Sequence, residues 1–217
     1  SESCPVLSRA VFDDKTDYMV VNSHVLDESY SLLKPKYYVL ADPSFFTSKE
    51  GYDILKAIAN KTKWNMMLFV PDQHVKKCGY LQKIKSNYIN IIHYNGYEYY
   101  GPESKRQYCY DCNLAMPSVE NVMVASLYIA IYLGYKTVEL YGVEHSWTKS
   151  LYVNDHNQVC LHDDHFYDKE KISDRIFTKS DGSYFKTHEI LKMYSRMFES
   201  YWEIKEIAIR KGVEIVN

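Results

Sequence analysis

Six short apolar runs divide this chain, and each of them ends at polar or turn-forming residues. The runs cover residues 18–21, 37–41, 65–70, 88–93, 137–141 and 213–216. Their length and their content of β-branched and aromatic residues predict strands. Between them, helical patterns cover residues 51–61, 74–85, 119–133 and 187–211. This alternation predicts an α/β fold, in which a Rossmann-like, mostly parallel sheet carries helices on both faces.

The helix predicted over residues 119–133 is the most informative element. Ser118 is a suitable N-cap, Asn121 then occupies the N3 position, and Gly134 ends the helix. A helix that is apolar on nearly every face must be buried on nearly every face. A strand is predicted directly afterwards, at 137–141, and the chain then becomes abruptly polar. Because ligands of open α/β sheets bind beyond the carboxyl ends of the strands, we expect the active site there.

Composition restricts the class of protein further. The chain has 217 residues, 46% of them hydrophobic, and a net charge of −2. These values favour one large globular domain and give no basic excess that would indicate nucleic acid. Its 22 tyrosines offer flat apolar faces with hydroxyl groups, which suit carbohydrate or nucleotide contact. The five scattered cysteines, an odd number, favour a reducing compartment over a disulfide framework.

Two long stretches, residues 94–117 and 146–184, lack a clear period, and we expect long functional or mobile loops there. We expect residues 1–217 to form a single domain that is truncated at both ends. The chain opens without a strand and Gly-rich turn, and it stops directly after a predicted strand. The sequence shows neither a signal peptide nor a run long enough to span a membrane, so we expect a cytoplasmic location.

Three segments together resemble the bacterial sialyltransferases of glycosyltransferase family 42 and the related MptE-like domain of Maf proteins. Residues 18–22 read YMVVN and residues 37–44 read YYVLADPS, where the sialyltransferases end the two strands with Asn and with Asn-Pro-Ser. The apolar helix ends in LGYK, as in the family, and residues 141–144 read YGVE, similar to the family's Gly-hydrophobic-Asp. The family's Gly-Asn-Gly-Pro-Ser turn is absent and Ser146 replaces a second tyrosine, and both departures count against sialyl transfer itself. Residues 142–147 (GVEHSW) and 165–168 (HFYD) look more like the MptE-like branch.

The resemblance implies a GT42-like variant of the GT-A fold and a glycosyltransferase of bacterial polysaccharide synthesis. An acidic sugar, sialic-acid-like or Kdo-like, would pass from a CMP-activated donor to a cell-surface glycan or lipid-linked acceptor at the inner face of the membrane. The donor itself would be the only small molecule required, without a further cofactor and without nucleic acid. The implied donor-binding residues are Asn22, Asp42, Ser44, Asn121, Glu144, His145 and Ser146. Tyr152 would stabilise the leaving phosphate, and His188 or His165 would be the general base.

Two other functions stay open. Pyrophosphate transfer from ATP to a pterin, as the MptE name implies, would need magnesium held by clustered carboxylates. A polar loop offers such groups in Asp155, His156, His162, Asp163, Asp164, His165 and Asp168. Their spacing matches no tight ligand motif, so we expect a solvated loop and no metal. The third interpretation is a nonenzymatic nucleotide-binding fragment.

Overall fold

A four-stranded parallel sheet forms the centre of the structure, a computed structural model that describes residues 15–75, 79, 81, 84, 86–143, 145, 147–163, 173–179 and 181–217. The strands are β1 (Met19–Val21), β2 (Tyr37–Val39), β3 (Met66–Pro71) and β4 (Ile89–Tyr94). They lie in the order β1-β2-β3-β4, and each neighbouring pair is parallel. The first four apolar runs of the sequence therefore form strands, as predicted.

Two smaller sheets accompany the central one. β5 (Thr137–Glu139) pairs in parallel with β9 (Glu214–Val216), which confirms the last two predicted strands. The strands β6 (Leu151–Val153), β7 (Val159–Asp163) and β8 (Ser173–Ile176) form an antiparallel sheet, preceded by the short helix α8 (Trp147–Ser150). The prediction of one long loop over 146–184 was therefore wrong. The strands are short, and a polar turn interrupts their alternation, so the sequence carries no visible period.

The remaining helices are η1 (His24–Leu26), α2 (Tyr30–Leu33), α3 (Ser44–Thr47), α4 (Lys49–Lys61), α5 (Asp72–Val75), α6 (Glu103–Asp111), α7 (Val122–Tyr132) and α9 (Thr187–Lys211). Three of the four predicted helices are confirmed. The helix predicted over 74–85 begins in α5, and much of it lies outside the described residues. Helix α6 lies in a stretch predicted to be a loop. Only Tyr110 of α6 is buried, so this helix shows little apolar periodicity.

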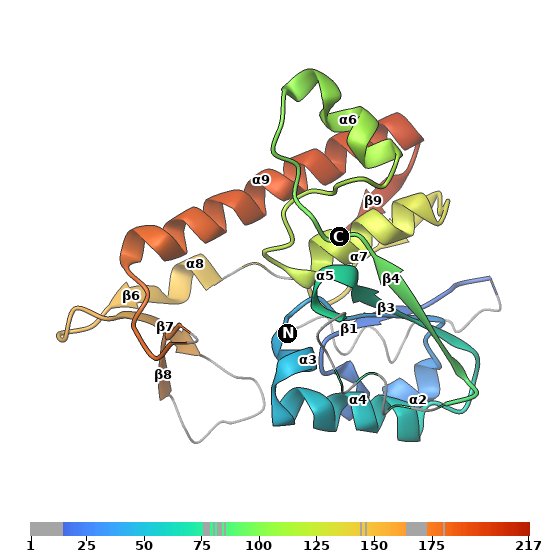
Figure 1. Cartoon of the computed structure of the whole chain (residues 1–217), viewed down its shortest axis with the longest axis horizontal. Helices are drawn as coiled ribbons and strands as arrows, with labels where there is room; N and C mark the ends of the chain where they lie inside the picture. Colours follow the sequence, from blue (N-terminus) through green and yellow to red (C-terminus); the bar gives the residue numbers. More distant parts are fainter. Residues whose placement is uncertain are drawn as a thin grey trace.

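Helices cover both faces of the central sheet (Figure 1). The alternating side chains of β2 show the division. Tyr37 and Val39 belong to the core under α6, α7 and α9, whereas Tyr38 and Leu40 belong to the core over α2, α3 and α4. The structure is thus a three-layer, Rossmann-like α/β arrangement, and the predicted fold class is confirmed at that level.

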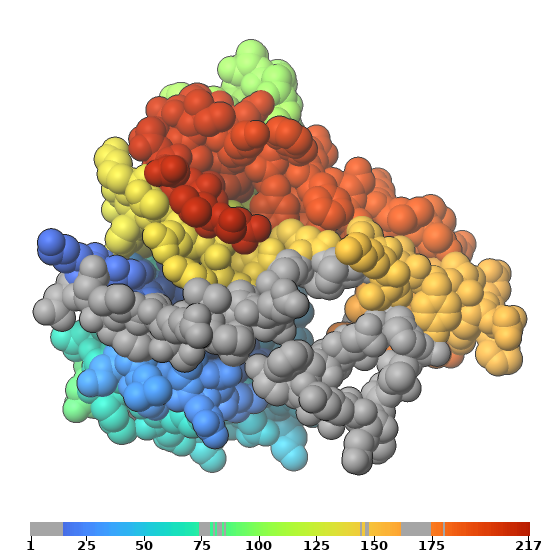
Figure 2. Space-filling model, turned by 180° about the vertical axis from the view of Figure 1, so that it is seen from behind, coloured from blue at the N-terminus to red at the C-terminus, as the bar shows by residue number. Residues whose placement is uncertain are grey.

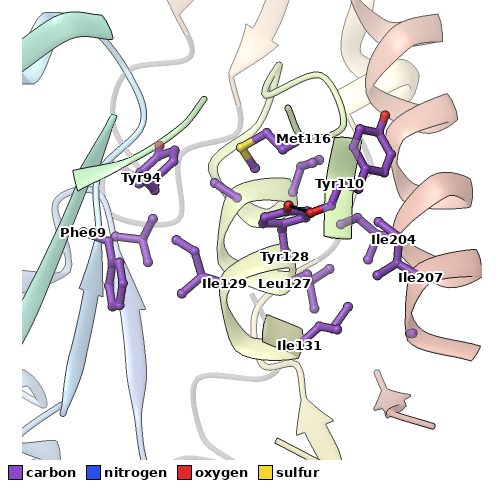
Figure 3. Packing of buried hydrophobic residues seen from close by; sticks show 14 of the residues in the cluster. Phe69, Tyr94, Tyr110, Met116, Leu127, Tyr128, Ile129, Ile131, Ile204 and Ile207 are labelled. Carbon is purple, nitrogen blue, oxygen red and sulfur yellow. Dashed lines mark hydrogen bonds between the residues drawn. The ribbon is translucent and has the colours of Figure 1, made fainter. Parts of the chain in front are cut away.

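Helix α7 is buried on nearly every face, as its composition predicts. All of its residues except Met123 and Tyr132 are buried. Figure 3 shows the reason, because α7 lies between the sheet, represented by Phe69, and α9, represented by Ile204. Two layers therefore enclose one helix, and no face of it is left for polar residues.

The start of α7 differs from the prediction. Asn121, not Ser118, is the N-cap, and its side chain accepts a hydrogen bond from the Met123 N–H. Ser118 lies deeper in the protein and accepts from Arg196 at 2.9 Å. At the other end, Gly134 follows the last turn with a φ of 90°, a conformation that favours glycine. In the described part of the chain, no helix is long and apolar enough to cross a membrane.

The connections between strands use both faces of the central sheet. Those from β1 to β2 and from β2 to β3 run over one face, whereas α7 lies on the opposite face and leads to β5. Just before β5, the hydroxyl of Tyr135 lies 2.9 Å from that of Tyr37 and also contacts Asp17, ahead of β1. The residues before β5 therefore contact β1 and β2, although β5 itself pairs with β9 in a separate sheet. In open α/β sheets, ligands bind beyond the carboxyl ends of the strands.

Candidate functional site at the carboxyl edge

Asn22 follows the last residue of β1, at the carboxyl end of the strand. Its φ is 52°, in the left-handed region that asparagine tolerates better than most residues. Its N–H donates to the Val39 carbonyl at 3.3 Å, and its own carbonyl accepts from the Tyr38 hydroxyl at 2.5 Å. The backbone of Asn22 is therefore held from the neighbouring strand, and the side chain extends beyond it.

The Tyr38 hydroxyl fixes the whole turn after β1. Besides donating to Asn22, it accepts from the Val25 N–H at 3.1 Å. The Val25 carbonyl in turn accepts from Lys61 Nζ at 2.8 Å. Burial raises the pKa of Tyr38, so its hydroxyl stays protonated and can keep donating.

One polar atom of this turn is buried without a hydrogen bond to any described residue. The side-chain oxygen Oδ1 of Asn22 is fully buried and has no hydrogen-bond partner among the described residues. A buried acceptor without a donor costs about 1–3 kcal/mol, so such atoms are rare unless they have a role. This orphan acceptor, next to an otherwise satisfied backbone, makes the carboxyl end of β1 a candidate ligand site.

Asp42 and Ser44 lie at the end of the neighbouring strand β2. The Asp42 carboxylate accepts from the Ser44 N–H at 2.7 Å, and the Asp42 carbonyl accepts from Phe45 N–H at 3.2 Å. Both residues are exposed, and Ser44 begins α3. Asp42 thus caps a turn while remaining accessible. Parallel pairing of β1 and β2 brings Asn22, Asp42 and Ser44 to one edge, as the sequence predicts.

The same edge continues through residues that the sequence analysis did not select. Asp72 follows β3, and its carboxylate lies 3.6 Å from the His93 ring near the end of β4. Gln73 accepts from the Gly96 N–H at 3.2 Å. Each of these groups directly follows or ends a predicted strand, and that position was the signal that could have identified them.

His145 lies beyond β5 and stacks on Tyr201 of α9, with ring centroids 4.9 Å apart. Its Nε2 atom is 2.7 Å from the Tyr201 hydroxyl. The two rings border a pocket of about 440 Å³ between α9 and the β5–β9 pair, lined mainly by apolar side chains. This pocket lies by β9 rather than by Asn22. Glu144 and Ser146, the other residues predicted here, lie outside the described residues.

The pKa of His145 gives a prediction for stability. Burial lowers it below the usual 6.5, so the folded state disfavours the proton that the unfolded state accepts. Above pH 6.5 His145 is mostly neutral in both states, so it should not change the free energy of unfolding. Below pH 6.5 the free energy of unfolding should fall, because the unfolded state binds more protons than the folded state. His145→Phe keeps an aromatic ring against Tyr201 but cannot titrate, so it should lose less stability on acidification. Urea unfolding on both sides of pH 6.5 measures this difference.

His24, whose pKa burial also lowers, acts in the same direction and remains in the variant. Glu203 acts in the opposite direction, because burial raises its pKa. Only the difference between wild type and His145→Phe therefore isolates His145. Equal losses in the two proteins would show that His145 does not titrate differently on folding.

The structure gives the predicted catalytic residues separate positions. Tyr152 lies in β6 opposite Cys160, and His188 is an exposed residue in the first turn of α9. Figure 1 shows the small sheet beside the start of α9, away from β1–β4. His165 lies outside the described residues. The structure thus groups Asn22 with Asp42 and Ser44, and it places Tyr152 and His188 on other elements.

Two further predictions are that Asn121 binds the donor and that the polar loop of residues 155–168 binds no metal. The side chain of Asn121 caps the start of α7 by accepting from Met123 N–H at 2.7 Å, and Arg196 pairs nearby with Glu98 and Glu120. Within the described ranges, no group of three His, Cys, Asp or Glu side chains could hold a metal ion. Of the proposed loop cluster, Asp164, His165 and Asp168 lie outside those ranges.

Comparison with known proteins adds no relative. No family model, no curated protein and no solved structure matches the chain. Function must therefore be inferred from the site itself, and the orphan Asn22 oxygen is its most specific feature.

Proposed function

We propose that the chain binds a nucleotide-activated sugar at the carboxyl ends of β1 and β2 and transfers the sugar to a glycan or lipid-linked acceptor. The observation that carries the proposal is the Oδ1 of Asn22, which is buried at the carboxyl end of β1 and has no hydrogen-bond partner among the described residues. An amide oxygen only accepts hydrogen bonds, so its ligand must supply an N–H or O–H group. Ribose hydroxyls and the exocyclic amine of cytosine are such groups, whereas an ionised phosphate is not.

The neighbouring residues suit the remainder of a nucleotide. The Asp42 carboxylate is exposed and can accept from a ribose hydroxyl, and the Ser44 hydroxyl can donate to a phosphate. The described part of this edge offers carboxylates rather than a cluster of cations. A monophosphate donor such as a CMP-sugar brings less negative charge to it than a diphosphate or triphosphate does. This favours a nucleoside monophosphate over a triphosphate, and the acidic sugar is assigned on the resemblance to family 42 alone.

Transfer itself needs a donor to the leaving phosphate and a base for the acceptor hydroxyl. We assign the first role to Tyr152 and the second to His188 or His165, on the resemblance alone. Closure of the small sheet over the central one would be required to bring Tyr152 to the nucleotide.

A pterin diphosphokinase is the second candidate. Asp42 and Asp72 follow β2 and β3, two neighbouring strands, and carboxylates at adjacent strand ends can hold magnesium for ATP. Asp72 already lies 3.6 Å from His93, which would have to release it. For this reason we rank the CMP-sugar first.

A thermal-shift panel tests the proposal. CMP, CDP, UDP, GDP and ATP are compared, each with magnesium and with EDTA, because a ligand that binds the native state raises its melting temperature. The expected result is stabilisation by CMP that EDTA does not remove. Stabilisation by ATP with magnesium alone would favour the kinase instead, and no shift with any nucleotide would contradict nucleotide binding.

A further inference from the structure

Helix α9 carries a second apolar stripe on the side opposite its buried one. The stripe consists of Leu191, Ser195, Phe198, Trp202, Lys205 and Ile209, here called the α9 seam. The spacings alternate between four and three residues, as at the a and d positions of a coiled coil, and keep the row on one face of the helix. The buried face of α9, by contrast, is formed by other residues, among them Ile190, Met197 and Ile204.

The α9 seam is open to solvent. Leu191 is 52% exposed, Phe198 39%, Trp202 65% and Ile209 69%. Lys205 Nζ lies 4.8 Å from the centre of the Trp202 ring, a cation–π contact that partly covers it. Figure 2 shows α9 along the outside of the molecule, next to β9. A contiguous row of large exposed side chains is unusual on a monomer and marks an interaction surface.

We propose that two copies of this chain pair antiparallel through their α9 seams and form a two-fold symmetric dimer. The reason is that the seam is complementary to itself. Its spacings are the same when read from either end. In an antiparallel pair Leu191 then faces Ile209, Ser195 faces Lys205, and Phe198 faces Trp202 of the second copy. A two-fold interface requires this kind of self-match, in which one patch serves both copies.

The pocket beside the seam fits the same pairing. Lys205 and Ile209 belong to the seam and also line the pocket of about 440 Å³, whose other walls are mainly apolar. In an antiparallel pair, Leu191 of the second copy lies over Ile209 and therefore at the mouth of this pocket. The pocket gives the end of the interface the concave apolar surface that a protruding Leu191 side chain needs.

Charges beside the seam also agree with the pairing. Lys192 and Glu206 are exposed and lie along the same flank, one near each end. Two-fold antiparallel pairing brings Lys192 of one copy to Glu206 of the other, twice. Glu199 lies near the centre of this flank and faces Glu199 of the second copy. Glu199→Gln removes the repulsion between these two carboxylates and should therefore tighten the dimer.

Sedimentation equilibrium over a dilution series tests the proposal on the whole chain. The wild type should reach twice its 25.6 kDa mass, and Trp202→Glu should raise the dimer Kd at least about tenfold. Leu32→Glu, at an exposed leucine of α2, is the matched control and should leave the Kd unchanged. A wild type that stays monomeric at every concentration overturns the proposal, as does a dimer that Trp202→Glu does not weaken.

A charge exchange tests the orientation of the helices. Lys192→Glu and Glu206→Lys should each weaken the dimer, and the double variant should recover most of the loss because the pair is restored in reverse. Circular dichroism confirms that each variant folds. Additive weakening in the double variant would refute the antiparallel arrangement. The test is independent of nucleotide binding, since no seam residue lies at the end of β1 or β2.

Discussion

Asn22→Gly is expected to weaken the binding of CMP by about 1–3 kcal/mol, or roughly fivefold to 150-fold in Kd. The substitution removes the buried Oδ1 acceptor that is proposed to bind the nucleoside. Glycine adopts the φ of 52° without a steric cost, so the turn after β1 can keep its shape. The free protein should be at least as stable as the wild type, because the change removes a buried acceptor that has no partner among the described residues, and this gain offsets the roughly 0.5–1 kcal/mol entropic cost of glycine. Calorimetric titration with CMP measures the change in affinity, and thermal unfolding measures stability.

Asn113→Gly is the matched control for this substitution. Asn113 has nearly the same φ, 53°, and lies exposed after α6, where its carbonyl accepts from the Asn95 side chain beyond β4 rather than at the ends of β1 and β2. It should show the same small effect on stability and no effect on CMP affinity. If Asn22→Gly retains full affinity, the orphan oxygen is not part of the nucleotide site.

Gly51→Ala is expected to lower the free energy of unfolding by about 3 kcal/mol, at the upper end of the cost of overpacking a core. Gly51 is buried where α4 packs against α3. An added Cβ would overlap the Ser44 carbonyl oxygen and lie 2.5 Å from the Phe45 Cα. These are backbone atoms, so no side-chain rotation can relieve the contact. At an ordinary position inside a helix, Gly→Ala raises the free energy of unfolding by up to about 1 kcal/mol. At Gly51 the same substitution should lower it.

Asp53→Ala, at an exposed position of the same helix, serves as the control and should change stability little. Because Ser44 belongs to the candidate site, the shift that Gly51→Ala forces on α3 should also weaken CMP binding. Denaturant titration measures the first effect and calorimetry the second. A variant as stable as the wild type would mean that α3 can move away freely.

Much of the central fold could be predicted because its determinants are local. The strands of the main sheet are buried on both faces, so each appears as a continuous apolar run, and α7 is apolar because two layers enclose it. Helix α6 escaped prediction because it buries only Tyr110 and is mainly polar elsewhere. The strands β6 and β7 are largely apolar, but they are only three and five residues long and a polar turn separates them, so they show no period.

The candidate site was predictable only in part. That Asn22, Asp42 and Ser44 share one edge follows from parallel strands, whose carboxyl ends meet. The left-handed backbone of Asn22, its bond from Tyr38 and its orphan oxygen depend on tertiary contacts that no local pattern encodes. The same holds for Ser118, whose hydroxyl accepts a hydrogen bond from Arg196 of α9 and does not cap α7. The catalytic roles of Tyr152 and His188 stay predictions.

The most direct measurement of the central claim is the pattern of NMR chemical-shift changes when CMP is added to the isotope-labelled chain. The side-chain amide of Asn22 and the backbone amides of Asp42 and Ser44 should shift together, with one common Kd. In Asn22→Gly, which lacks that side chain, the Asp42 and Ser44 amides should respond only at much higher CMP concentration. Shifts confined to His145 and Tyr201, around the pocket beside β9, or no shifts at saturating CMP, would contradict a nucleotide site at the carboxyl ends of β1 and β2.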